Sequence, residues 1–223
     1  VNRLTGSRTI ITRKMQTPPS LTYEQKLKLD DLAERLIASE EPVTILIDGH
    51  EAEISEYLIK KLPNARVVMD GGSLRASNIK LAAWTDYFVL SEHFARDYMS
   101  YRSLSTEAEI KAALIELNKI CRGEAFITLG EKGCAFLKSG MLQIVPSWLC
   151  NAVDTTGAGD VFHGAFTYGV HYSWHIDNII LFASLTAAIS IEKKGVRESM
   201  PDLAVVHHSL NSYERNLTQY FEE

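Results

Sequence analysis

Asp154-Thr-Thr-Gly-Ala-Gly-Asp-Val-Phe-His-Gly-Ala-Phe166 is the stretch that says most about how this chain folds and what it does. Its small residues Gly157, Ala158 and Gly159 allow a tight turn that points unpaired backbone N–H groups toward one place. Apolar residues at helical spacing follow, so the turn is predicted to begin a buried helix. Free N–H groups and the helix dipole favour an anion there, and the stretch therefore predicts a phosphate site.

Asp160 lies in the first turn of this predicted helix, beside the expected anion. A carboxylate next to a bound phosphate is electrostatically unfavourable, so its expected use is to take a proton from a hydroxyl that attacks the phosphate. A structural interpretation stands beside this one: Asp154 and Thr155 cap the helix, the glycines make a turn, and Asp160 complements the helix dipole. These residues by themselves leave both interpretations open.

Composition is typical of one soluble enzyme domain. The 223 residues are 46% hydrophobic, enough for one substantial core without a disulfide or metal, so a single domain over 1–223 is expected. The net charge of −5, without a basic run, predicts no nucleic-acid partner and no anionic membrane partner. The three cysteines are odd in number and widely spaced, which indicates reduced thiols and a cytoplasmic protein.

Strands and helices are predicted to alternate, which is typical of a doubly wound α/β fold, a mostly parallel sheet with helices on both faces. Expected strands cover 43–47, 65–69, 87–90 and 125–129, the first of them buried, and an antiparallel hairpin over 134–138 and 142–145 is expected at one edge. Expected helices begin at the capping boxes of Thr22 and Thr106 and also cover about 51–62, 77–83, 159–172, 177–193 and 202–222. The apolar face of the first helix, expected to be buried, includes Ile37.

Parallel sheets bind ligands at the carboxyl ends of their strands. Asp48-Gly49 and Asp70-Gly71-Gly72 follow two predicted strands, so they either face a cleft at this edge or only form turns into helices. His163 comes one turn after Asp160; it could reach the site, although a packed, hydrogen-bonded histidine is the commoner outcome. His171 and His175 have the spacing of a metal pair, but a surface pair at a helix end is the commoner outcome, so no zinc site is predicted.

The stretch over residues 154–166 resembles the second signature of the ribokinase-like, or PfkB, family of carbohydrate and nucleoside kinases. The resemblance implies that Gly157, Ala158 and Gly159 form the anion hole for the transferred phosphoryl group and that Asp160 is the catalytic base. It implies ATP-dependent phosphorylation of a primary hydroxyl of a small sugar, with Mg²⁺. A nucleoside or other small-alcohol kinase, or a non-catalytic kinase-like remnant, is the alternative, and the identity of the sugar is left open.

Two further stretches resemble the nucleotide site of that family. The turn over 128–133 resembles the nucleotide loop, although its glycines alone would only indicate a strand–hairpin turn. The stretches 182–190 and 193–201 resemble the adenine-side helix and the loop after it. The implied nucleotide contacts are Thr128, Gly130, Glu131, Gly133, Ser184, Gly195 and Ser91. Ser91 departs from the pattern, because the family often carries an Asn-x-x-Glu motif near the ATP-bound magnesium, where this chain has Ser91 and Glu92.

Members of the family that are activated by a monovalent cation bind it between the start of the signature and the loop after the adenine-side helix. The resemblance places a potassium site here, mostly through backbone carbonyls. The matching positions are Asp154, Thr156, Ser190, Lys193, Gly195 and Ser199.

The family's opening strand, its first glycine-rich signature and much of its sugar-binding wall have no counterpart in this sequence. Residues 6–11 resemble the strand that returns from the family's small β lid, so about 1–17 are expected to be a lid remnant. We therefore expect the chain to be a fragment that is inactive in isolation. Pairing of two copies through the lid, giving a homodimer, is a further expectation.

Overall fold

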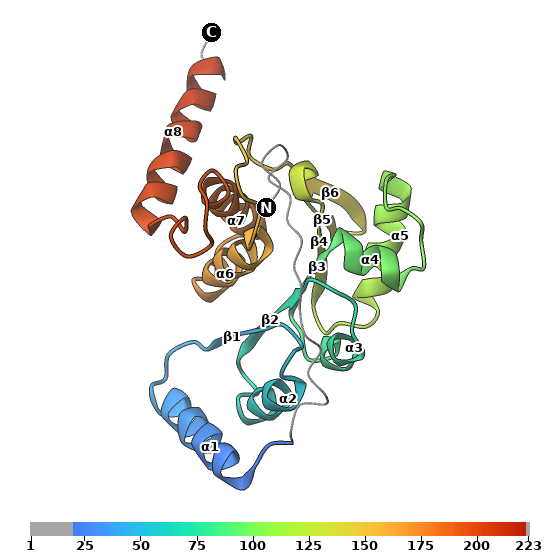
Figure 1. The fold of residues 1–223 in the computed structure, drawn as a ribbon, viewed down its shortest axis with the longest axis vertical. Helices are drawn as coiled ribbons and strands as arrows, with labels where there is room; N and C mark the ends of the chain where they lie inside the picture. The colour runs from blue at the N-terminus through green and yellow to red at the C-terminus, as the bar shows by residue number, and fades with distance from the viewer. Residues whose placement is uncertain (1–19, 222–223) are drawn as a thin grey trace.

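The computed structural model describes residues 20–221, which contain a six-stranded sheet in the order β1-β2-β3-β4-β5-β6 (Figure 1). The strands are β1 (Thr44–Ile47), β2 (Arg66–Gly71), β3 (Tyr87–Ser91), β4 (Glu124–Thr128), β5 (Cys134–Lys138) and β6 (Met141–Val145). The helices are α1 (Tyr23–Ala38), α2 (Ala52–Lys61), α3 (Ala76–Ala82), α4 (Glu92–Tyr98), α5 (Glu107–Asn118), α6 (Ala158–His171), α7 (Ile176–Ser190) and α8 (Leu203–Phe221). Strands β1 to β4 pair in parallel, so their carboxyl ends share one edge of the sheet.

Successive apolar side chains of the central strands point to opposite faces of the sheet. Along β2, Val67 and Met69 pack into the core under α2 to α5, whereas Val68 packs into the core under α6 and α7. Each of the three is at most 1% exposed. This alternation follows from the two-residue period of a strand, and it explains why the strands are almost continuously hydrophobic.

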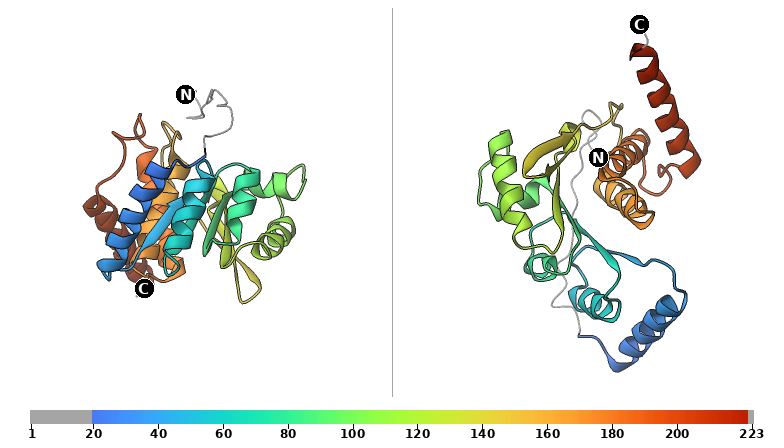
Figure 2. Two further views of the ribbon diagram at one scale, coloured as in Figure 1. Left: turned by 90° about the horizontal axis from the view of Figure 1, so that it is seen from below. Right: turned by 180° about the vertical axis from the view of Figure 1, so that it is seen from behind.

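Helices cover both faces, as a doubly wound α/β fold requires. Helices α4 and α5 lie on one side of the sheet and α6 and α7 on the other (Figure 1). Helix α8 packs on α7 through its first turns, where Val206 is buried, and then extends away from the sheet (Figure 2). None of the helices between residues 20 and 221 is both long and apolar enough to cross a membrane. The predicted fold class is confirmed.

Local sequence signals account for several boundaries. Thr22 and Thr106 form the expected capping boxes with Gln25 and Glu109, which fix the first turns of α1 and α5. The hairpin of β5 and β6 lies at the sheet edge next to β4, and Gly140 has the positive φ of 76° that its tight turn needs. Both predictions are confirmed.

The structure corrects three expectations. Strand β1 is an edge strand and not fully buried, since Leu46 is 42% exposed. Helix α4, directly after β3, was not predicted, because a helix this short carries little periodic signal. Ile37, expected on the buried face of α1, is 60% exposed. The expected lid remnant at 1–17 lies outside the described residues, and the single domain over 1–223 therefore stays a prediction.

Candidate active site

The first turn of α6 leaves backbone donors open at the carboxyl edge of the sheet. Gly157 is the residue before the helix, with a left-handed backbone at φ 76° and ψ 3°, and no side chain caps the helix. Among the described residues, the N–H groups of Gly159 and Asp160 meet no acceptor, and that of Ala158 has only a 3.3 Å contact to Thr155 O. The Asp154 carboxylate accepts N–H groups of Thr156 and Gly195, both outside α6, and so does not cap the helix; the turn can receive an anion.

Asp160 lies in this first turn with an exposed side chain. Its carboxylate makes no hydrogen bond or ion pair with the part of the chain that the structure describes. It borders a hollow of about 420 Å³ at the ends of β1 and β2, which we call the strand-end hollow. The lining residues are Leu46, Ile47, Asp48, Glu51, Ser55, Asp70 and Asp160. An unpaired carboxylate facing such a hollow is free to accept a proton.

Asp48 and Asp70 face this hollow, as one of the two interpretations of their sequence predicted. Asp48 Oδ1 accepts the backbone N–H of His50 at 2.8 Å, which holds the turn after β1. Asp70 Oδ2 lies 3.2 Å from Nδ1 of His163, a histidine that is only 2% exposed. Burial raises the pKa of the Asp70 carboxyl, the neighbouring His163 opposes that rise, and Asp160 and Asp48 add to it.

The start of the 154–166 stretch is hydrogen-bonded to the loop after α7. Asp154 is buried, and its carboxylate accepts the N–H groups of Thr156 at 3.0 Å and Gly195 at 3.3 Å. Hydrogen bonding, first from the Thr156 side chain and then from these backbone groups, holds the pKa of Asp154 below its usual range. A Cβ on Gly157 would lie 2.5 Å from Cγ1 of Val196, so the turn and the loop also pack closely.

Four of the six residues expected at the potassium site lie close together. Asp154, Thr156 and Gly195 share the hydrogen bonds just described, and the Ser199 hydroxyl donates to Gly195 O. Ser190 ends α7, where its hydroxyl donates to Ala187 O at 2.7 Å, and the Lys193 side chain is exposed. The arrangement supplies oxygen atoms around the turn, as a large cation requires, and the site itself stays a prediction.

The expected nucleotide loop joins the end of β4 to β5. Gly133 has a φ of 102°, and a Cβ there would lie 2.0 Å from Val145 O, so only glycine fits. Gly130 and Glu131 begin a 3₁₀ turn with exposed side-chain positions, and Thr128 Oγ1 donates to Leu90 O at 3.2 Å. The fold itself thus requires glycine at 133, whereas the turn at 130–131 is exposed and leaves room for a ligand.

The two remaining nucleotide candidates are held by the fold. Ser184 is buried on α7. Ser91 is the N-cap of α4: its hydroxyl accepts the N–H of Phe94 at 3.0 Å and donates to Gly72 O at 2.9 Å. These bonds give Ser91 a structural role, and its contact with a nucleotide stays a prediction.

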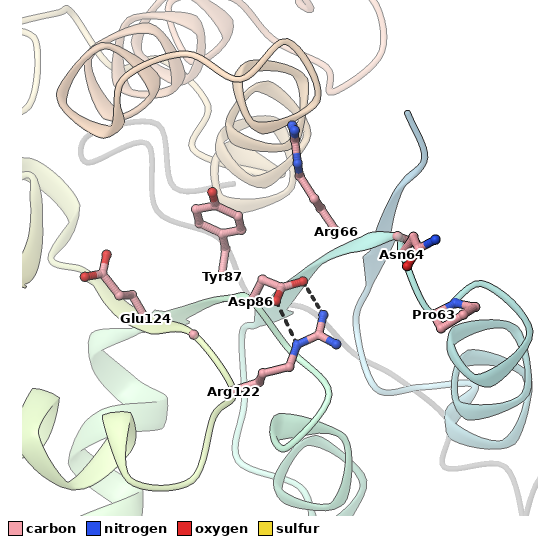
Figure 3. A pocket seen from close by; sticks show the side chains of 9 residues that line it. Pro63, Asn64, Arg66, Asp86, Tyr87, Arg122 and Glu124 are labelled. Atoms are coloured by element: carbon pink, nitrogen blue, oxygen red, sulfur yellow. Dashed lines mark hydrogen bonds and ion pairs between the residues drawn. The ribbon is translucent and has the colours of Figure 1, made fainter. Parts of the chain in front are cut away.

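A second hollow, of about 520 Å³, opens at the opposite edge of the sheet, where β2, β3 and β4 begin (Figure 3). Its two arginines are already engaged. Arg122 forms a two-pronged ion pair with Asp86, while Arg66 Nη1 donates to Val170 O at 2.6 Å at the end of α6. Both guanidinium groups thus bind within the protein, where they join the starts of β2 and β3 to the end of α6 and to the turn before β4.

Sequence reasoning missed Glu51 and Ser55 as lining residues of the strand-end hollow. Both lie at the start of α2, far from Asp160 in the sequence, and only the folded chain shows that they line the same hollow as Asp160. Within the described residues, no group of three or more His, Cys, Asp or Glu is placed to hold a metal ion. The three cysteines are free, and burial raises the pKa of Cys121 to about 11 and of Cys134 to about 12, which leaves both thiols protonated.

Comparison with protein families gives a match over residues 76–203, to the family described as pfkB family carbohydrate kinase. A ribokinase from Lactococcus lactis is 29% identical over 189 residues, which cover 85% of this chain and 60% of that protein. A deoxyribokinase from Salmonella typhi is 31% identical over 131 residues, or 59% of this chain and 42% of that protein. The chain thus spans 60% or less of the length of these two relatives.

Solved structures share the fold. A ribokinase from Giardia lamblia has a TM-score of 0.69 at 23% identity, covering 82% of this chain and 62% of that one. An Arabidopsis thaliana ribokinase, solved in complex with ribose and ATP, has a TM-score of 0.67 at 20% identity, covering 86% of this chain and 60% of that one.

Proposed function

The chain belongs to the PfkB family of carbohydrate kinases, and from that premise we propose that it carries the phosphoryl-transfer site of an ATP-dependent sugar kinase. The acceptor is a primary hydroxyl of a small sugar. The relatives support this choice, since they are named ribokinase and deoxyribokinase. The proposed setting is the cytoplasm, where ATP is supplied and free thiols such as those of this chain stay reduced.

The proposal rests on Asp160, which lies beside open N–H groups at the start of α6 and makes no hydrogen bond or ion pair within residues 20–221. We assign Asp160 as the base that takes the proton of the sugar hydroxyl. The hydroxyl oxygen then forms a bond to the γ-phosphorus of ATP while the bond from that phosphorus to the β–γ bridging oxygen breaks, releasing ADP. The amides of Gly159 and Asp160 stabilise the charge on the transferred oxygens.

We assign the nucleotide to the carboxyl edge of the sheet, between the turn at 128–133 and the α7 end with its following loop. The exposed 3₁₀ turn at 130–131 and the loop packed against Gly157 flank the proposed anion hole from two sides. We expect magnesium to enter with the phosphates of ATP, since such a site needs only one or two protein carboxylates.

The test is an assay of ADP formation by the natural protein with ATP and a panel of acceptors: pentoses, hexoses, nucleosides and glycerol. A neutral sugar that stimulates ADP release, with its monophosphate identified by mass spectrometry, supports the proposal. Stimulation by a nucleoside alone would move the assignment to nucleoside kinases. Failure of every acceptor, together with no binding of ATP, would overturn the proposal and favour a non-catalytic protein.

A further inference from the structure

His163 has hydrogen-bond acceptors at both ring nitrogens, although it is only 2% exposed. Its Nδ1 lies 2.6 Å from Gly159 O and 3.2 Å from Asp70 Oδ2. Its Nε2 lies 3.2 Å from Val89 O on β3. A neutral imidazole has only one N–H, so one of its nitrogens would turn a lone pair toward a carbonyl oxygen. Only the doubly protonated ring has an N–H at both nitrogens: Gly159 O and Asp70 Oδ2 share the one at Nδ1, and Val89 O faces the one at Nε2.

The carboxylates around the ring favour the same state. Asp70 on β2 is the direct partner, and Asp160 on α6 and Asp48 after β1 lie near enough to act on the Asp70 carboxyl. A cation among three carboxylates offsets their mutual repulsion, which a neutral ring would leave in place.

The contact with Gly159 O links the ring to the proposed anion hole. Gly159 O and the N–H of Asp160 belong to one planar trans peptide, so they point in opposite directions. A donor that fixes the carbonyl therefore also fixes the direction of the N–H, one of the open donors of the first turn. The other two contacts anchor the same ring to Asp70 near the end of β2 and to Val89 in the middle of β3.

We propose that His163, as an imidazolium, is a positioning residue that locks the first turn of α6 onto Asp70 and Val89 and thereby aims the Asp160 peptide at the transferred phosphate. The functional part of this inference rests on the proposed kinase activity. The protonation state of the ring and its hold on the first turn of α6 do not rest on that activity, because they follow from the contacts of the ring.

The first experiment measures the ring directly. ¹⁵N-histidine labelling of the 223-residue chain, with assignment of His163 by its absence in His163→Gln, reports whether each ring nitrogen carries a proton. We expect both His163 nitrogens to carry a proton at neutral pH. A bare ring nitrogen at neutral pH in the unsubstituted chain would overturn the proposal.

The second experiment measures the turn. Amide relaxation dispersion should show new exchange at Ala158, Gly159 and Asp160 in His163→Gln. The matched control is His171→Gln at the other end of α6, where Nδ1 contacts Thr44 Oγ1 at 3.3 Å. Equal behaviour of the two variants, both folded, would contradict the locking role. His163→Asn, which is smaller, serves as the second variant if His163→Gln does not fold.

The third experiment separates positioning from binding in the natural protein. His163→Gln should lower kcat by about 10- to 100-fold, with a change in the KM for ATP of less than roughly threefold, because an aimed donor acts mainly in the transition state. An unchanged kcat would overturn the functional role. If the unsubstituted protein shows no kinase activity, the proposed function fails while the two measurements on the ring and the turn still decide the locking.

Discussion

Replacing Gly157 by alanine should destabilise the protein for two reasons that the structure separates. The first is the backbone: Gly157 has a φ of 76°, and an L residue in the left-handed region costs about 1–2 kcal/mol. The second is contact: the new Cβ would lie 2.5 Å from Cγ1 of Val196, a stiff β-branched side chain. Overpacking of this kind costs about 1–3 kcal/mol.

The two costs together predict a loss of about 2–5 kcal/mol, a large part of the roughly 5–15 kcal/mol that stabilises a typical domain. Two other glycines supply controls. Gly140 also has a φ of 76° but has nothing within 4 Å of an added Cβ, so Gly140→Ala should show the backbone cost alone. Gly164 lies exposed in α6 with nothing near, so Gly164→Ala should stabilise by about 0.5–1 kcal/mol.

The assay is urea unfolding of the four proteins, followed by tryptophan fluorescence and far-UV circular dichroism. The predicted order of stability is Gly164→Ala, then the unsubstituted chain, then Gly140→Ala, then Gly157→Ala. If Gly157→Ala loses no more stability than Gly140→Ala, the turn is not packed closely on Val196 and Gly157 is not fixed by that contact.

Three further predictions follow from the same geometry. Because hydrogen bonds lower the pKa of Asp154 in the folded state, its contribution to stability is full above its unfolded pKa of about 3.9 and is lost as the pH falls through the lower folded pKa. Asp154→Asn should therefore lower the free energy of unfolding at neutral pH and give a shallower loss of stability in acid; equal acid unfolding curves would contradict this. Titration with a non-hydrolysable ATP analogue and magnesium should shift amide resonances at 128–133 and 184–195, and shifts confined to the Arg66–Asp86 edge would contradict the nucleotide assignment. Kinase activity of the natural protein should be higher in potassium than in sodium or tetramethylammonium, and equal rates in the three would contradict the cation site.

Local signals in the sequence were sufficient to predict most of the fold. The alternation of Val67, Val68 and Met69 between two cores is a two-residue pattern that a strand buried on both faces must carry. The capping residues Thr22 and Thr106 act within one helical turn, so they can be identified without tertiary information.

The sequence misled where a local signal was weak or where a neighbour distant in the sequence decided the outcome. Helix α4 is seven residues long, and only Ser91, its N-cap, offered a signal. The exposure of Leu46 depends on β1 having no second strand beside it in the described sheet, which a local pattern cannot report. The strand-end hollow is lined by Glu51, Asp70 and Asp160, which come from three separate segments of the chain. The sequence could therefore suggest Asp160 as a catalytic residue without deciding which residues surround it.

We have assigned Asp160 as the base of a phosphoryl-transfer site at the start of α6. The most direct measurement compares the turnover of Asp160→Asn with that of the unsubstituted natural protein at saturating ATP and sugar. Loss of a positioned base predicts a turnover lower by about 10²–10⁴, with the fold and the affinity for ATP retained. A variant that keeps more than about a tenth of the turnover would contradict the assignment of Asp160.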